Sequence, residues 1–212
     1  MRISLTCLLL FAACPFFILP GCKKSDQSSF GKASFQAADF SLAVGDQWVY
    51  RVTDYYTNAT DTLILSVTRL QAFPDGSKKY RCDIIQKAAV VDSGAYSISN
   101  NILTYQGLNP NQYSYFGNFK LQFSFGSGSQ WIGFYPADTV KVISELGSTK
   151  ILGKAYLHVF SLKRGFALLG NYSMVQFILI APGVGIINQS INLFDGGPGQ
   201  NQSFELISYT LH

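Results

Sequence analysis

The side chains of residues 119–125 alternate strictly between apolar and polar. The apolar positions are Phe119, Leu121, Phe123 and Phe125, and the polar positions between them are Lys120, Gln122 and Ser124. Because successive side chains of a β-strand point to opposite faces, this period of two predicts a strand with one face on a core and the other in water. A chain built from such segments is expected to fold as a sheet that buries one of its faces.

Comparable short segments recur along the chain, separated by turn signals. One signal is Pro74-Asp75-Gly76, in which proline presets φ and glycine accepts a positive φ. Residues that favour helices are scarce, and Glu145 and Glu205 are the only glutamates. The pattern gives about eleven short strands. It predicts an all-β fold with a strongly curved antiparallel sheet, a half-barrel or barrel-like structure, and a β-sandwich is the alternative.

The first 22 residues have the layout of an export signal. Arg2 supplies a positive end, residues 3–19 are largely apolar, and the segment closes with Leu19-Pro20-Gly21-Cys22. This ending resembles the lipobox read by bacterial lipoprotein signal peptidase, with proline at the middle place that a small or β-branched residue usually takes. The resemblance implies cleavage after Gly21, a diacylglyceryl group on the Cys22 sulfur and a further acyl chain such as palmitate on the freed amine. A non-cleaved anchor, or an ordinary signal with an incidental cysteine, is the alternative.

This reading divides the chain into three parts. They are a signal peptide at residues 1–21, a polar and flexible tether at residues 22–38, and a single β domain at residues 39–212. Several acyl chains on Cys22 would hold the protein at a bilayer. Lys23 stands where aspartate retains lipoproteins at the inner membrane of enteric bacteria, so the outer membrane is the expected location. Its periplasmic face and the cell surface both stay open.

The mature part offers little material for catalysis. Cys82 is its only free thiol, which excludes intrachain disulfides, and its strand-like surroundings predict a half-buried core cysteine. Only two histidines occur, His158 and His212, too few for a histidine-based triad or a multi-histidine metal site. His158 is expected to be a strand residue. We therefore expect no enzyme, no metal and no cofactor, and a carbohydrate-active hydrolase with two facing carboxylates is the least favoured alternative.

Charge gives no reason to expect a nucleic-acid partner. Without Arg2 the 16 Lys and Arg fall to 15, against 12 Asp and Glu, and they are scattered along the chain without a basic stripe. Aromatic residues are the enriched class, with 17 Phe, 12 Tyr and 2 Trp. A β core accounts for such residues, and the alternative is an apolar or stacking surface for a lipid, a glycan or a protein. The candidate ligand-binding residues flank the longest loops and are Trp131, Phe134, Tyr135, Tyr113 and Tyr115.

Two triplets match the acceptor pattern for O-glycosylation in Bacteroidetes, an aspartate followed by serine or threonine and then an aliphatic residue. They are Asp61-Thr62-Leu63 and Asp138-Thr139-Val140. Thr62 and Thr139 are therefore possible glycan attachment sites.

Two longer segments, residues 44–50 (VGDQWVY) and residues 181–187 (APGVGII), lie near the two ends of the mature chain. Together they resemble uncharacterised Bacteroidetes lipoproteins with a G-x-x-W-x-Y opening and a PGVG closing segment, which are similar to curved-sheet proteins of the lipoprotein-carrier type. The resemblance implies core anchors at Trp48 and Tyr50 and a turn or bulge at Gly183 and Gly185, and no catalytic residues. It favours a non-catalytic binding module for a lipid or other hydrophobic ligand. A structural or interaction subunit of an envelope complex is the alternative.

Overall fold

The computed structural model of the chain describes residues 34–108, 117–167, 173–193 and 201–212. Residues Lys32–His212 form a compact unit by themselves. The signal peptide, Cys22, Tyr113 and Tyr115 lie outside the described residues. None of the described helices is long and apolar enough to cross a bilayer.

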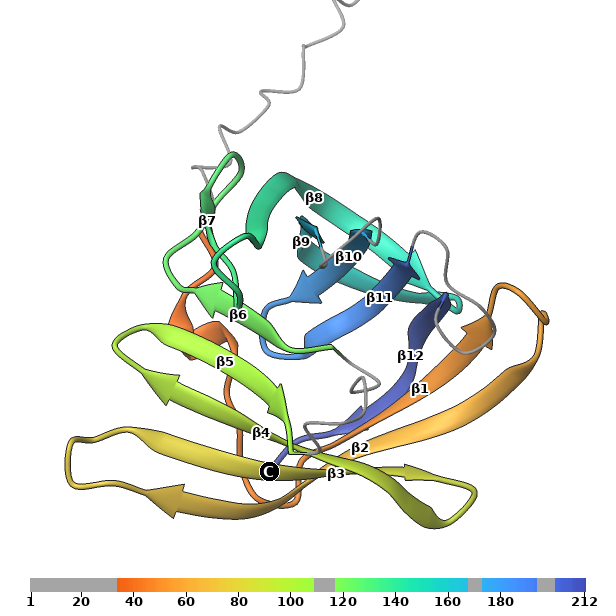
Figure 1. The fold of residues 1–212 in the computed structure, drawn as a ribbon, viewed down its shortest axis with the longest axis horizontal. Coiled ribbons are helices and arrows are strands. Elements are labelled where there is room, and N and C mark those ends of the chain that lie inside the picture. The colour runs from red at the N-terminus through yellow and green to blue at the C-terminus, as the bar shows by residue number, and fades with distance from the viewer. Residues whose placement is uncertain (1–33, 109–116, 168–172, 194–200) are drawn as a thin grey trace, which may run out of the picture. The chain divides into compact units, whose positions relative to one another are not determined.

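The described chain forms one antiparallel sheet with a single short 3-10 turn, η1, at Ala37–Asp39 (Figure 1). The strands are β1 (Gln47–Asp54), β2 (Thr60–Ala72), β3 (Lys78–Gln86), β4 (Ala89–Ser99), β5 (Ile102–Gly107), β6 (Phe119–Gln122), β7 (Gln130–Ile132), β8 (Thr139–Ile151), β9 (Lys154–Ala167), β10 (Ser173–Ala181), β11 (Gly185–Leu193) and β12 (Gln202–Thr210). Their order is β6-β5-β4-β3-β2-β1-β12-β11-β10-β9-β8-β7. The first and last strands therefore pair in the middle of the sheet, and β6 and β7 are its edges.

The sheet curls until its two edge strands meet. The indole Nε1 of Trp131 on β7 donates to the backbone oxygen of Lys120 on β6 at 2.9 Å. A second bond crosses the seam between β6 and β7: Asn118 Nδ2, just before β6, donates to the hydroxyl of Tyr135, just after β7, at 2.9 Å. Side chains thus join two edges that the strand order leaves unpaired. The predicted strongly curved, barrel-like antiparallel sheet is confirmed.

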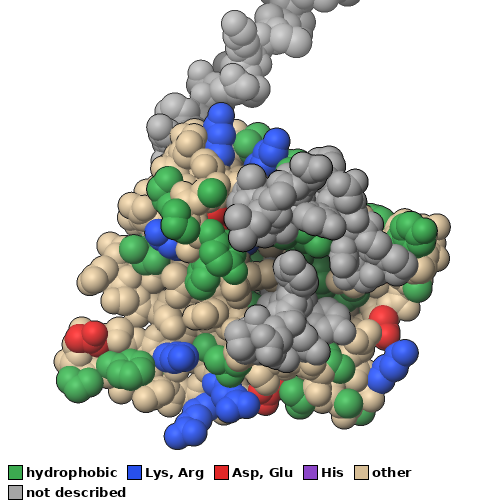
Figure 2. All heavy atoms as spheres, in the orientation of Figure 1, with side chains coloured by type: hydrophobic (Ala, Val, Ile, Leu, Met, Phe, Trp, Pro, Cys, Tyr) green, Lys and Arg blue, Asp and Glu red, His purple; other side chains and the backbone are tan. Residues whose placement is uncertain are grey.

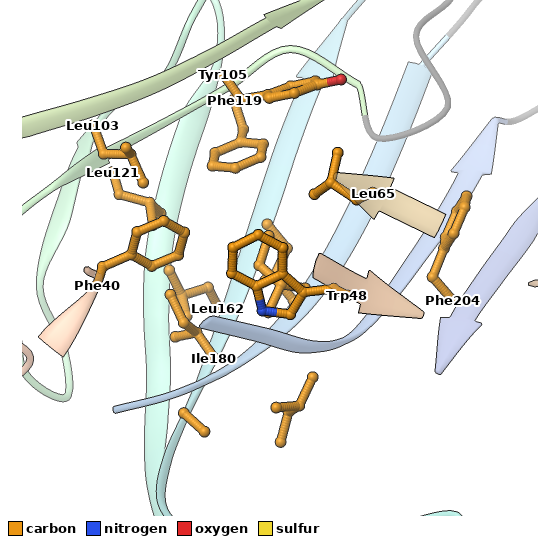
Figure 3. Packing of buried hydrophobic residues seen from close by; sticks show 14 of the residues in the cluster. Phe40, Trp48, Leu65, Leu103, Tyr105, Phe119, Leu121, Leu162, Ile180 and Phe204 are labelled. Atoms are coloured by element: carbon orange, nitrogen blue, oxygen red, sulfur yellow. The ribbon is translucent and has the colours of Figure 1, made fainter. Parts of the chain in front are cut away.

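Apolar side chains from all sides fill the concave face of the sheet. Phe119, Leu121, Phe123 and Phe125 are all buried, as the alternation predicts. In Figure 3 the rings of Tyr105 and Phe119 lie near Phe40 and Trp48, which come from other parts of the chain. Tyr96 bridges this group, with ring centroids 4.9 Å from Tyr105 and 5.9 Å from Phe40.

The strand predicted at residues 119–125 ends early. β6 stops at Gln122, and Ser124 adopts a positive φ of 63° that a regular strand does not allow. The next residues pair instead with the N-terminal segment, since Phe35 N donates to Phe125 O at 2.7 Å. The Phe35 ring stacks on Phe125 at 5.0 Å and meets Phe160 edge-on at 5.7 Å.

Residues 34–40, here called the strap, therefore belong to the folded unit. Asp39 accepts a hydrogen bond from the Gln36 backbone at 2.7 Å, which fixes η1, and its carbonyl accepts from Gly183 at 2.8 Å. The tether was expected to extend to residue 38. Within that range, Phe35 is fully buried.

The opening and closing segments of the sequence meet at the same end of the sheet as the strap. Trp48 Nε1 donates to the backbone oxygen of Val184 at 2.7 Å, and the Tyr50 hydroxyl donates to Ile186 O at 2.9 Å. Both aromatic side chains lie in the core, as expected. Between the two acceptors, Gly185 has a φ of 95°, a conformation that favours glycine. These contacts close this end of the interior.

Candidate functional site

Four polar side chains lie inside the otherwise apolar sheet. Arg164 is 1% exposed, and Asp138, Gln176 and Gln189 are fully buried. Arg164 lies near the end of β9 and Gln176 near the start of β10, where the two residues face each other in register. This end of the interior is opposite the strap, because β1 begins beside the strap and neighbouring strands are antiparallel. We call Arg164, Asp138 and Gln176 the polar cluster.

The polar cluster is held by short hydrogen bonds. Arg164 Nε donates to Asp138 Oδ2 at 2.7 Å, and Arg164 Nη1 donates to Gln176 Oε1 at 3.0 Å. The backbone N–H of Phe134 donates to the same carboxylate oxygen at 2.9 Å. A Cβ at Gly133 would collide with the Asp138 carboxylate, so a residue without a side chain is needed there. The cluster thus fixes the connection between β7 and β8.

Burial and pairing act in opposite directions on the guanidinium. Desolvation lowers the pKa of Arg164, and the neighbouring Asp138 carboxylate raises it in part. Taking a charge out of water is costly unless it is paired and hydrogen-bonded, and this pair meets that condition through Asp138 Oδ2. The other carboxylate oxygen, Oδ1, is buried with no hydrogen-bond partner among the described residues.

Three of the five candidate aromatic residues lie on β7 or on the connection that the polar cluster fixes. Trp131 is buried, with its ring centroid 5.5 Å from that of Phe125, and it bonds to β6 as described. Phe134 is half-buried and meets Tyr135 edge-on at 5.0 Å. Tyr135 is 42% exposed and is the most accessible of the three. Trp131 and Tyr135 contribute to closure of the seam, and ligand binding by the three residues stays a prediction.

Sequence reasoning missed the polar cluster although its signal was present. Arg164 is in phase with the buried Leu162 along β9, and Gln176 is in phase with Ile178 along β10. A charged or amide side chain at a core position of a strand indicates a buried polar group that needs a partner. The scattered turn aspartates gave no indication that Asp138 would be that partner.

The two possible glycosylation sites differ in accessibility. Thr62 is exposed on β2. Thr139 is half-buried, and the aspartate of its triplet, Asp138, is occupied by Arg164. Attachment at either residue stays a prediction, and the structure offers Thr62 as the more accessible hydroxyl.

His158 lies on β9 with a positive φ of 52°. Its Nδ1 is 3.2 Å from Glu145 Oε1, and its side chain is about half exposed at 48%. Among the described residues, no group of three His, Cys, Asp or Glu side chains is placed to hold a metal ion.

Cys82 is fully buried on β3, more deeply than the half-buried position predicted. Desolvation raises the pKa of its thiol to about 12. Because the thiolate is the reactive form, we expect native protein at pH 8 to react with a disulfide reagent far more slowly than protein unfolded in guanidinium. Absorbance of the released thiolate measures both rates. Equal rates would contradict the buried position.

Similarity to known proteins is low. The sequence matches no protein-family model and no curated protein. Among solved structures, the chain is similar to a protein from Bacteroides fragilis described as exported with a YmcC-like fold, at 10% identity over 84% of this chain and 100% of that chain, TM-score 0.46. A protein from Parabacteroides distasonis described as a lipoprotein has 8% identity, coverage of 84% and 99%, and a TM-score of 0.42. The MucA/MucB complex of Pseudomonas aeruginosa has 7% identity, coverage of 78% and 50%, and a TM-score of 0.30.

Proposed function

We propose that this chain is a lipid-anchored lipoprotein of the cell envelope, held in the outer membrane through Cys22. Its β domain is a non-catalytic binding module for a lipid or another hydrophobic ligand. The observation that carries the proposal is that the interior of the sheet changes from apolar at one end to partly polar at the other. Aromatic rings fill the strap end, and Arg164, Gln176 and Gln189 lie toward the opposite end. An amphiphile matches this arrangement, because it has an apolar body and a polar group that needs hydrogen-bond partners.

The buried glutamines are the residues that would distinguish such a ligand from a plain hydrocarbon. Gln189 pairs across strands with Phe204 of β12 and Ile178 of β10, so its amide lies between two apolar neighbours. A buried amide is retained where it is hydrogen-bonded, and the donor and acceptor atoms of Gln189 can also serve the polar group of a ligand. Replacing Gln189 with methionine keeps the shape and removes the hydrogen-bonding capacity.

Native mass spectrometry with lipid extraction tests the binding function. The protein is a soluble version that begins near Ser25 and is expressed in a bacterial periplasm. We expect a co-purifying amphiphile at defined stoichiometry in the wild type and lower occupancy in Gln189→Met. The control is Gln122→Met, the same change on an exposed position of β6. A clean apo mass with no extractable lipid would contradict the proposal.

A second candidate function is an interaction subunit of an envelope complex. The observation that favours it is the set of apolar side chains on the outer surface, among them Leu157 at 65% exposure, Phe177 and Ile207. A clean apo mass together with a crosslinked protein partner lost in Leu157→Ser would favour this function over ligand binding.

A further inference from the structure

The β2–β3 hairpin extends beyond β1 on one side, while β4 pairs with β3 on the other. β1 makes its last pair with β2 at Ser66, so from Arg69 onward β2 pairs only with β3. Every residue from Arg69 to Gly76 is exposed. We call residues 69–81 the basic hairpin, and Figure 1 shows it protruding at the lower left.

Positive charge is concentrated on the basic hairpin. It carries four cationic side chains, which are Arg69, Lys78, Lys79 and Arg81, against one carboxylate, Asp75. Arg69 and Arg81 are directly opposite each other across the two strands. Like charges in that position destabilise a strand pair. Two carboxylates offset part of this charge: Asp75, whose Oδ1 accepts from the backbone and hydroxyl of Ser77, and Asp83, whose Oδ1 lies 3.7 Å from Arg81 Nε.

Apolar side chains accompany these charges. Leu70 is 43% exposed and Phe73 is 39% exposed, both on the same hairpin. Figure 2 shows Lys and Arg side chains next to hydrophobic ones along the lower left of the molecule, where Figure 1 places β2 and β3. Basic residues flanking exposed apolar residues are typical of surfaces that bind anionic lipid.

The basic hairpin lies at the same end of the sheet as the strap. The tip of the hairpin and the strap are both at the end where β1 begins, and Gly45 N there donates to Val67 O at 2.9 Å. Ser34 stands twelve positions after Cys22, a span of at most about 43 Å. At the opposite end, Asp54 and Asp61 are partly exposed, Lys87 Nζ lies 3.6 Å from Asp61 Oδ2, and Asp92 and Asp138 are buried.

We infer that the basic hairpin docks on an anionic phospholipid surface. The contact orients the domain with the strap toward the membrane and the polar cluster away from it. The inference rests on the proposed lipid anchor, which brings the hairpin within reach of the bilayer. Phosphate groups then offset the repulsion between Arg69 and Arg81, and Phe73 enters the headgroup region.

Vesicle co-sedimentation of the soluble domain Lys32–His212 tests the inference. This part is a compact unit and lacks Cys22, so binding does not depend on acylation. We expect binding to vesicles of phosphatidylglycerol and phosphatidylethanolamine, and its loss on phosphatidylcholine vesicles or at high salt. Replacing Lys78→Gln and Lys79→Gln together weakens binding about 30-fold, from the usual contribution of each basic residue near an anionic surface.

The matched control is Lys141→Gln with Lys163→Gln, an exposed lysine pair facing each other on β8 and β9. It removes the same charge and leaves vesicle binding within about twofold of wild type, since it lies outside the basic hairpin. Equal weakening in both double variants would overturn the inference, because general charge would then be responsible. Binding to soluble polyglutamate with none to vesicles would also overturn it, in favour of an acidic protein. A globomycin-sensitive mobility shift, absent in Cys22→Ala, tests the anchor separately.

Discussion

Replacing Arg164 with methionine lowers the free energy of unfolding by about 3–5 kcal/mol. The substitution removes the guanidinium that bonds to Asp138 at 2.7 Å and to Gln176 at 3.0 Å. It leaves the Asp138 carboxylate fully buried without its opposite charge. Urea unfolding of the soluble domain, followed by tryptophan fluorescence, measures the change.

Two further variants isolate the cause. The double variant Arg164→Met with Asp138→Leu removes both charges. Its free energy of unfolding is expected to be close to that of the wild type or above it, because the cost of desolvating two buried charges often exceeds the attraction between them. Lys163→Met makes the same kind of change one residue earlier on the exposed face of β9 and stays within about 0.5 kcal/mol of wild type. A double variant as unstable as Arg164→Met would refute the ion-pair explanation.

Replacing Trp48 with alanine costs about 3–5 kcal/mol, the range for a large buried aromatic residue. The indole is 3% exposed and packs at the end where β1 meets the β10–β11 turn. The change leaves a cavity and also leaves Val184 O without the donor that lies 2.7 Å from it. The same urea titration measures the loss.

Trp48→Phe separates the two effects, because it keeps most of the apolar volume and removes the indole N–H. Its expected cost is about 1–3 kcal/mol, from an unsatisfied acceptor and a smaller cavity. Tyr56→Ala is the control, since this ring is 69% exposed in the turn after β1 and its loss changes stability little. If Trp48→Ala and Tyr56→Ala were equally stable, the described contact would have no structural role.

Local sequence predicts the strands of this protein better than it predicts how they close. The alternation at Phe119 to Phe125 identifies a buried face, because successive side chains of a strand point to opposite faces whatever the rest of the fold is. Closure depends on Trp131 reaching Lys120 and on Phe35 reaching Phe125 and Phe160. Phe35 stands in a polar stretch that has no pattern of its own, so only the folded chain places it in the core.

For the candidate site, too, the sequence indicates single residues better than their contacts. The aromatic residues around Trp131 stood out by composition, and the structure places them on β7 and on the connection fixed by the polar cluster. The burial of Arg164 could be predicted, because it lies two positions after Leu162 on β9 and therefore on the same face of the strand. Its pairing with Asp138 could not, because the two residues are 26 positions apart and meet only after β8 and β9 pair.

The pairing of β1 with β12 sets the order in which this protein can fold. Asp54 pairs with Gln202 and Gln47 with Thr210, so the centre of the sheet joins the two ends of the domain. Closing so long a loop is slow, and it cannot begin before the last strand is available. A chain that emerges N-terminus first therefore stays without its central strand pair until residue 210 is available.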